Sequence, residues 1–130
     1  MHQEPGTSNF DVLAHQSYLN IETFRKNGVG VKTPVWFVLD CETVYIKTGT
    51  ESGKVKRIHH NGRVNIAPCK MDGQLLGEWI PATARVVEES EVSKKVNRLL
   101  DKKYGLMKNI FGLFSPRKGK NSILEIGLQA

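Results

Sequence analysis

The feature that most restricts the fold of this chain is a series of short segments, separated by turn sequences, in which apolar and polar residues alternate. Six such segments are rich in β-branched or aromatic residues, as is typical of half-buried strands. They span residues 18–25, 29–39, 44–48, 63–69, 79–87 and 123–128. Strands joined by short turns pair antiparallel. We therefore expect a mainly β fold, in which a six-stranded antiparallel sheet closes or partly closes into a barrel.

Turn residues mark several ends of these strands. Asn27 and Gly28 form a hairpin signal, because both residues tolerate the positive φ angles of tight hairpin turns. Residues 40–43 (DCET) and 71–74 (MDGQ) have the composition of turns. Pro34 lies within the second strand, and since proline has no backbone N–H, it marks an edge strand, a bulge or a strand start.

A short helix is expected over residues 53–60. Ser52 has the side chain of a helix N-cap, and Val55 and Ile58 lie three residues apart on what would be the buried face. The sequence Asn-Gly at residues 61–62 ends the helix.

A longer amphipathic helix is expected over residues 90–104, ending at Gly105. Its apolar positions follow a helical spacing and are Val92, Val96, Leu99 and Leu100. Residues 106–114 form a second, shorter apolar segment, and residues 115–122 a polar loop. Residues 1–17 are expected to form an N-terminal arm or short helix ahead of one domain over residues 18–130.

Cysteine and histidine usage argues against a disulfide scaffold or a metal site. Cys41 and Cys69 are the two cysteines of the 130 residues and form no CxxC pair, and the four histidines have no ligand spacing. No apolar run approaches the roughly 20 residues of a membrane helix. The first ten residues lack the features of a signal peptide. We therefore expect a cytoplasmic protein with no membrane span.

The formal net charge of +6 favours a polyanionic partner, which could be a nucleic acid, an acidic lipid or a small molecule. Nucleic-acid binding ranks last among the functional interpretations. Binding of single strands needs aromatic side chains near the cations, and the basic runs KVKRIHHNGR and SPRKGKNS contain none.

The stretch TGTESGKVKRI, residues 48–58, concentrates groups that bind phosphate. Hydroxyl side chains precede a helix start, where free backbone N–H groups and the helix dipole favour an anion, and two cations three residues apart share one face. The candidate residues are Thr48, Thr50, Ser52, Gly53, Lys54 and Arg57. A Walker A loop is excluded, because the run is one residue short and has Val55 where a hydroxyl is needed. A solvated basic face is the alternative interpretation.

Longer runs resemble the pyridoxamine 5′-phosphate oxidase-like superfamily, and within it the small flavin- or deazaflavin-dependent oxidoreductases of the split β-barrel fold. These runs are TPVWFV, VYIKTGTESGKVKRIHHNGRVNIAPC, GEWIPATARVV, LLDKKYG and the final ILEI. The resemblance covers nearly the whole chain. It implies an FMN-binding split barrel with two or three peripheral helices, FMN or coenzyme F-420 as cofactor, and a homodimer with the cofactor at the subunit interface.

The resemblance also assigns roles to individual residues. The cofactor phosphate falls on Thr48, Thr50, Ser52, Gly53 and Lys54, and a basic residue of the second strand that reaches it corresponds to Lys32. The backbone of Lys32, Thr33, Pro34 and Val35 would run along the edge of the ring. Trp36 and Trp79 are possible ring or pocket contacts. The oxidases carry Arg-Lys before the helix where this chain has Gly53-Lys54, so one of their phosphate cations has no counterpart here.

No nucleophile or acid–base pair emerges from the sequence, which fits an enzyme whose cofactor carries the chemistry. The first interpretation is an oxidoreductase that transfers hydride between F-420 or FMN and a small organic substrate, with a slight preference for F-420. The alternative is a non-catalytic carrier or sensor of flavin, F-420 or heme on the same barrel.

Overall fold

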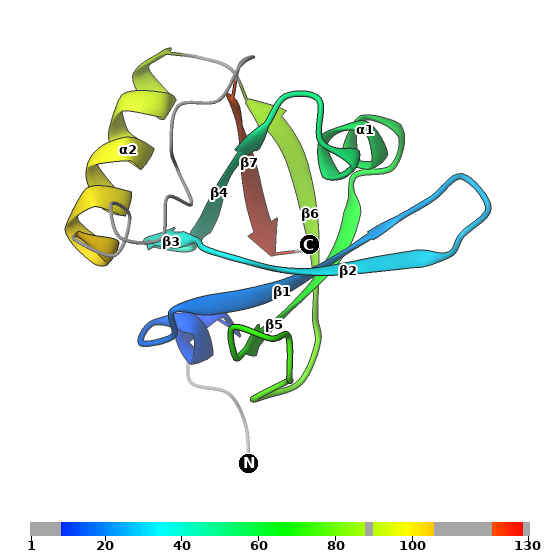
Figure 1. Cartoon of the computed structure of the whole chain (residues 1–130), viewed down its shortest axis with the longest axis horizontal. Helices are drawn as coiled ribbons and strands as arrows, with labels where there is room; N and C mark the ends of the chain where they lie inside the picture. The colour runs from blue at the N-terminus through cyan, green and yellow to red at the C-terminus, as the bar shows by residue number, and fades with distance from the viewer. Residues whose placement is uncertain (1–8, 88–89, 106–120, 129–130) are drawn as a thin grey trace.

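The computed structural model describes residues 9–87, 90–105 and 121–128. Figure 1 shows strands in the middle of the molecule, with α1 and α2 on opposite sides of β4, β7 and β6. The elements are η1 (Asn9–Leu13, a 3-10 helix), β1 (Tyr18–Phe24), β2 (Gly30–Val35), β3 (Val38–Asp40), β4 (Thr43–Gly49), α1 (Gly53–His60), β5 (Arg63–Cys69), β6 (Ile80–Val87), α2 (Ser90–Tyr104) and β7 (Asn121–Leu128).

The strands of the described residues form one seven-stranded sheet in the order β2-β1-β5-β6-β7-β4-β3, and every ladder among them is antiparallel. Strands β2 and β3 are the two edges, yet only Trp36 and Phe37 separate them in the chain. The chain from Val35 to Val38 spans at most about 11 Å. Seven strands laid flat would hold their edges about 29 Å apart. The sheet therefore has to curl, and the fold is the expected split barrel.

The strand count differs from the prediction because the segment expected over residues 29–39 divides into two strands. Trp36 and Phe37 are adjacent and both buried, which breaks the alternation of a single strand. The chain leaves one edge of the sheet before them and joins the other edge after them. Pro34 lies in β2, an edge strand, where its missing N–H is tolerated.

The buried apolar side chains of the described residues form two hydrophobic cores. The first fills the barrel and includes Leu19, Ile21, Phe37, Val44, Ile46, Ile66, Leu124 and Ile126. The second lies between α2 and the outer face of the sheet and includes Trp36, Val38, Tyr45, Val96, Leu100, Tyr104 and Ile123. Trp36 and Phe37 thus belong to different cores, one on each side of the sheet.

The local signals in the sequence placed the helices and the hairpin correctly. Helix α1 spans Gly53–His60 with Ser52 as its N-cap. Helix α2 spans Ser90–Tyr104, and Gly105 follows it with a φ of 45°. Gly28 has a φ of 89° in the hairpin turn. Helix η1 lies within the predicted N-terminal arm, whereas the apolar segment 106–114 lies outside the described residues.

Neither α1 nor α2 combines the length and the apolar character needed to cross a membrane.

Replacing Phe37 with alanine should lower the free energy of unfolding by about 3–5 kcal/mol, the range for truncating a fully buried phenylalanine. Val29→Ala is the control: that side chain is 50% exposed and should matter by less than about 0.5 kcal/mol. Urea unfolding followed by tryptophan fluorescence measures both. A cost below about 1 kcal/mol for Phe37→Ala would show that closure of the barrel does not depend on this side chain.

Candidate functional site

The candidate phosphate site is built where α1 closes one end of the barrel. Helix α1 packs against β1 and β6, and its buried residues Val55 and Ile58 belong to the barrel core. Figure 1 shows α1 beside β6 and above the β1–β2 hairpin, joined to β4 by a short turn. The helix start and the last residues of β4 are therefore fixed relative to each other.

Ser52 caps the helix and keeps one hydrogen-bond donor available. Its hydroxyl oxygen accepts from the backbone N–H of Val55 at 3.3 Å and from the hydroxyl of Thr48 at 3.3 Å. Since a hydroxyl has one proton and two acceptor positions, both acceptor positions are used and the proton remains to donate. The first turn of α1 contains no acidic residue. The helix start is thus positive and has donors for an anion.

Arg57 folds back across the helix start. Its Nε donates to the hydroxyl of buried Thr23 on β1 at 2.6 Å. A Cβ atom built on Gly53 would lie 2.6 Å from one guanidinium nitrogen of Arg57, so glycine is what lets the guanidinium lie over the first turn. Thr23 therefore fixes the guanidinium beside the backbone N–H groups of the helix start.

Lys54 adds a second cation to this end of α1. Burial, and then the charge of Arg57, lower its pKa below the ordinary value. Neither cation forms an ion pair within the described part of the chain. Lys56, two residues after Lys54 in α1, is exposed. Two partly buried cations without a described carboxylate are a place where a bound anion would relieve both desolvation and repulsion.

The remaining predicted hydroxyl, Thr50, lies 2.8 Å from the hydroxyl of Ser122 on β7. Ser122 is buried and faces Thr48 in the β4–β7 ladder. Sequence reasoning missed both Ser122 and Thr23, because each reaches the site through an element distant in the chain: Thr23 through helix α1 and Ser122 through strand β4. Each lies at every second position with core residues of its strand, Thr23 with Ile21 and Ser122 with Leu124, which indicates that it faces inward. The local sequence does not indicate which distant residues these side chains contact.

The predicted ring-side residues lie on β2, and they alternate between its two faces. Thr33 pairs with Ile21 and so faces the barrel interior, whereas Lys32 pairs with Glu22 on the outer face. Since Thr23, the partner of Arg57, also faces inward, Lys32 lies on the opposite face of the β1–β2 ribbon from Arg57. Within one chain the structure does not bring Lys32 to the start of α1.

Lys32 instead lies against Trp79, with its ammonium 5.5 Å from the centroid of the indole. Trp79 is half-buried, immediately before β6. The two side chains form a cation–π pair beside β2. Trp36 has a different setting: it is 4% exposed and stacks on Tyr104 of α2, with ring centroids 4.1 Å apart.

Asn20, also missed in the sequence, lies next to Pro34 on the outer face of this ribbon. Its side-chain N–H donates to the carbonyl of Gly73 at 3.1 Å and so fastens the β5–β6 loop. Its buried Oδ1 atom has no hydrogen-bond donor among the described residues.

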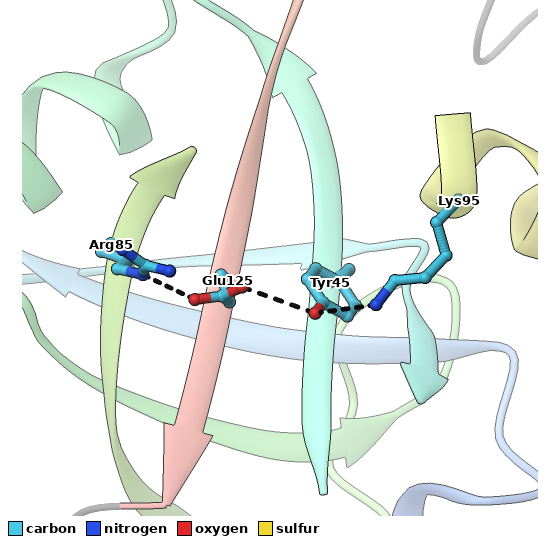
Figure 2. Close-up of polar contacts among 4 residues, drawn as sticks. All are labelled: Tyr45, Arg85, Lys95 and Glu125. Carbon is cyan, nitrogen blue, oxygen red and sulfur yellow. Dashed lines mark hydrogen bonds and ion pairs between the residues drawn. The ribbon is translucent and has the colours of Figure 1, made fainter. Parts of the chain in front are cut away.

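A separate polar row crosses the outer face of the sheet, as Figure 2 shows. Glu125 accepts from Arg85 at 2.5 Å and from the Tyr45 hydroxyl at 3.4 Å, and Lys95 of α2 donates to that hydroxyl at 3.4 Å. Lys95 also pairs with Asp40 at 3.0 Å, which raises the pKa of Lys95. This row ties α2 to the sheet and contains none of the predicted site residues.

The described residues contain no group of three or more histidine, cysteine, aspartate or glutamate side chains that could hold a metal ion.

Comparison with known protein families decides the classification. The family model described as pyridoxamine 5′-phosphate oxidase matches residues 10–130. The chain belongs to this family. The match covers both the start of α1 and strand β2, so both groups of candidate residues lie inside the family domain. The comparison with curated proteins gives no match.

Solved structures agree on the fold. An F-420 reductase is 16% identical, with a TM-score of 0.61, and the superposition covers 95% of this chain and 96% of the other. HutZ, the heme storage protein from Vibrio cholerae, is 16% identical with a TM-score of 0.68, covering 89% and 84%. A variant of HupZ from Group A Streptococcus is 18% identical with a TM-score of 0.64, covering 95% of each chain. At these identities the likeness establishes the split barrel alone.

The unpaired cations predict a gain in stability when one is removed. Lys54→Met should raise the free energy of unfolding in buffer without multivalent anions, by about 0.2–0.5 kcal/mol from the like-charge pair alone. Because folding lowers the pKa of Lys54, the unfolded chain binds this proton more tightly. The wild-type penalty is therefore present at neutral pH and fades as pH rises toward 10.5.

Thermal unfolding of wild type, Lys54→Met and the exposed control Lys56→Met, with and without inorganic phosphate, measures this effect. Inorganic phosphate should stabilise the wild type more than either variant, and it should reduce the difference in stability between the wild type and Lys54→Met. Equal stabilisation by the two substitutions would mean that diffuse positive charge, rather than a discrete site, is at work.

Proposed function

We propose that this protein is an oxidoreductase that binds coenzyme F-420 or FMN and transfers hydride between the cofactor and a small organic substrate. The observation that supports the proposal most is the start of α1. There Lys54 and Arg57 lie beside free backbone N–H groups without a described carboxylate, in a chain of the pyridoxamine 5′-phosphate oxidase family.

The residues at this end of α1 fit a phosphate group. The Ser52 proton and the N–H groups of Gly53 and Lys54 supply neutral donors, and the Lys54 and Arg57 side chains supply charge. A phosphate monoester, as in FMN, carries nearly two negative charges, which matches two cations and a helix N-terminus. Thr48 and Thr50 orient this set through their bonds to Ser52 and Ser122.

The ring would lie along β2, whose far edge has no partner strand among the described residues. Successive residues of a strand direct their backbone groups to opposite edges, so the N–H and C=O groups of alternate residues in Lys32–Val35 would be available on that side to ring nitrogen and oxygen atoms. Pro34 has no N–H and could offer its carbonyl alone. Lys32 and Trp79 would flank the ring from the outer face.

When bound, such a cofactor would supply the hydride chemistry. The protein would hold the phosphate, orient the ring along β2 and limit the access of water, which are the roles left to a protein when its cofactor reacts. The slight preference for F-420 comes from the TPVW and SGK runs and from the glycine at position 53, where the oxidases carry a further cation.

A homodimer with the site between subunits is part of this proposal. It is supported by the separation of Lys32 from Arg57 across the β1–β2 ribbon, because two subunits could supply both faces of one site.

A non-catalytic carrier of flavin, F-420 or heme is the second candidate, and the likeness to HutZ and HupZ favours it. The described histidines His15, His59 and His60 are all exposed, so none lies in a closed pocket ready to bind heme iron. The absorbance spectrum of the purified protein, followed by titration with FMN, F-420 and heme, identifies the ligand. Oxidation of reduced cofactor under turnover then separates an enzyme from a carrier. Preference for heme over both flavin-type cofactors would overturn the first proposal.

The discrete phosphate site predicts unequal effects of neighbouring lysines. Lys54→Ala should weaken cofactor binding by about 1.5–3 kcal/mol, the range for a hydrogen bond to a charged group. Lys56→Ala removes the same charge from an exposed position and should cost less than about 0.5 kcal/mol. Fluorescence titration with FMN or F-420 measures both affinities. An equal loss of affinity in both variants would show that this region is a solvated basic face and not a discrete phosphate site.

A further inference from the structure

The segment that directly follows the proposed ring-binding strand is held by one hydroxyl group of α2. The Tyr104 hydroxyl lies 3.0 Å from the Phe37 nitrogen, 2.9 Å from the Phe37 oxygen and 2.8 Å from the Ser17 oxygen. It accepts from the Phe37 N–H, and its one proton is shared between the carbonyls of Ser17 and Phe37. Burial raises the pKa of Tyr104, so the hydroxyl keeps this proton at neutral pH.

The rings and a neighbouring lysine strengthen the same contact. Trp36 stacks on Tyr104 with planes 5° apart. Lys103 donates to the Phe37 carbonyl at 3.0 Å and lies 3.5 Å from the centroid of the Phe37 ring. Both residues of the link between β2 and β3 are therefore fixed from α2.

Strand β2 needs such an anchor because it is an edge strand. Among the described strands it pairs with β1 alone, so within that part of the chain one side of its backbone is held by a ladder. Val35 ends the strand, and Trp36 and Phe37 follow it without a gap. An edge held at its last residues has less freedom to shift, and a preorganised edge loses less entropy when a ligand binds to it.

We propose that Tyr104 is a positioning residue for the cofactor ring: its hydroxyl fixes the link after β2 and thereby the backbone of Lys32–Val35. The inference rests on the proposed function, since it takes the ring to lie along β2. Under this proposal the binding energy has two separable parts: Tyr104 affects the part that comes from the ring, and Lys54 affects the part that comes from the phosphate.

The test compares two tyrosine-to-phenylalanine variants. Tyr104→Phe keeps the ring that stacks on Trp36 and removes the hydroxyl. Tyr45→Phe is the matched control: Tyr45 is also buried, and its hydroxyl also joins α2 to the sheet, through Lys95 and Glu125, without touching the link (Figure 2). Unfolding is measured for both variants, so that affinities are compared at temperatures where each is folded.

Tyr104→Phe should weaken binding of the cofactor by about three- to tenfold, the scale of one hydrogen bond. The substitution should weaken binding of the phosphate-free ring compound by the same factor. That compound is riboflavin for FMN and the deazaflavin nucleoside for F-420. The affinity ratio of cofactor to ring compound stays constant in this variant and falls in Lys54→Ala. Tyr45→Phe should leave both affinities within about twofold of wild type.

Several results would overturn the inference. Unchanged affinity in Tyr104→Phe, an equal loss in Tyr45→Phe, or a loss confined to the phosphate-bearing ligand would each contradict a ring-positioning role.

If Tyr104→Phe does not fold, Lys103→Met tests the inference instead, since it removes the other side-chain donor to the Phe37 carbonyl. This variant should show a smaller loss of affinity with the same pattern, and no loss would overturn the inference. A wild-type protein that binds neither FMN nor F-420 would instead refute the proposed function.

Discussion

The link of two residues between β2 and β3 is the constraint on which the rest of the structure depends. It joins strands at opposite edges of one seven-stranded sheet, so the sheet cannot be flat. The link also separates the two cores, because Phe37 packs into the barrel and Trp36 packs under α2. A change in the conformation of the link would therefore alter the curvature of the sheet, the packing of α2 against the sheet and the position of the β2 edge together.

The candidate site follows from that curvature. A curled sheet leaves an open end, and α1 closes it with Val55 and Ile58, which places the helix start beside the ends of β1 and β4. Only there do a cap hydroxyl, free N–H groups and two unpaired cations meet among the described residues. Most single-residue contacts at this site are worth little alone. In the proposed site, the partial burial of Lys54 and Arg57 without a described carboxylate would favour the binding of an anion.

Much of this could be predicted from the sequence, because the signals were local. The N-cap Ser52, the glycine after α2 and the alternation of the strands depend on neighbouring residues, and they gave the helix bounds and the antiparallel sheet. The division of residues 29–39 into two strands was missed, because β-branched and aromatic residues continue through Trp36 and Phe37 and only the closed barrel separates them. Thr23 and Ser122 were missed for a related reason: their partners lie 34 and 72 residues away in the chain.

The most direct test of this account is a map of backbone amide shifts by nuclear magnetic resonance, recorded with inorganic phosphate, with the phosphate-free ring compound and with the complete cofactor. Inorganic phosphate should move the Gly53 and Lys54 amides and leave β2 unchanged. The ring compound should move Lys32, Thr33 and Val35 and leave the start of α1 unchanged, and the cofactor should move both groups. Shifts that gather instead along β6 and β7, with Gly53 and Lys54 unmoved by every ligand, would contradict it.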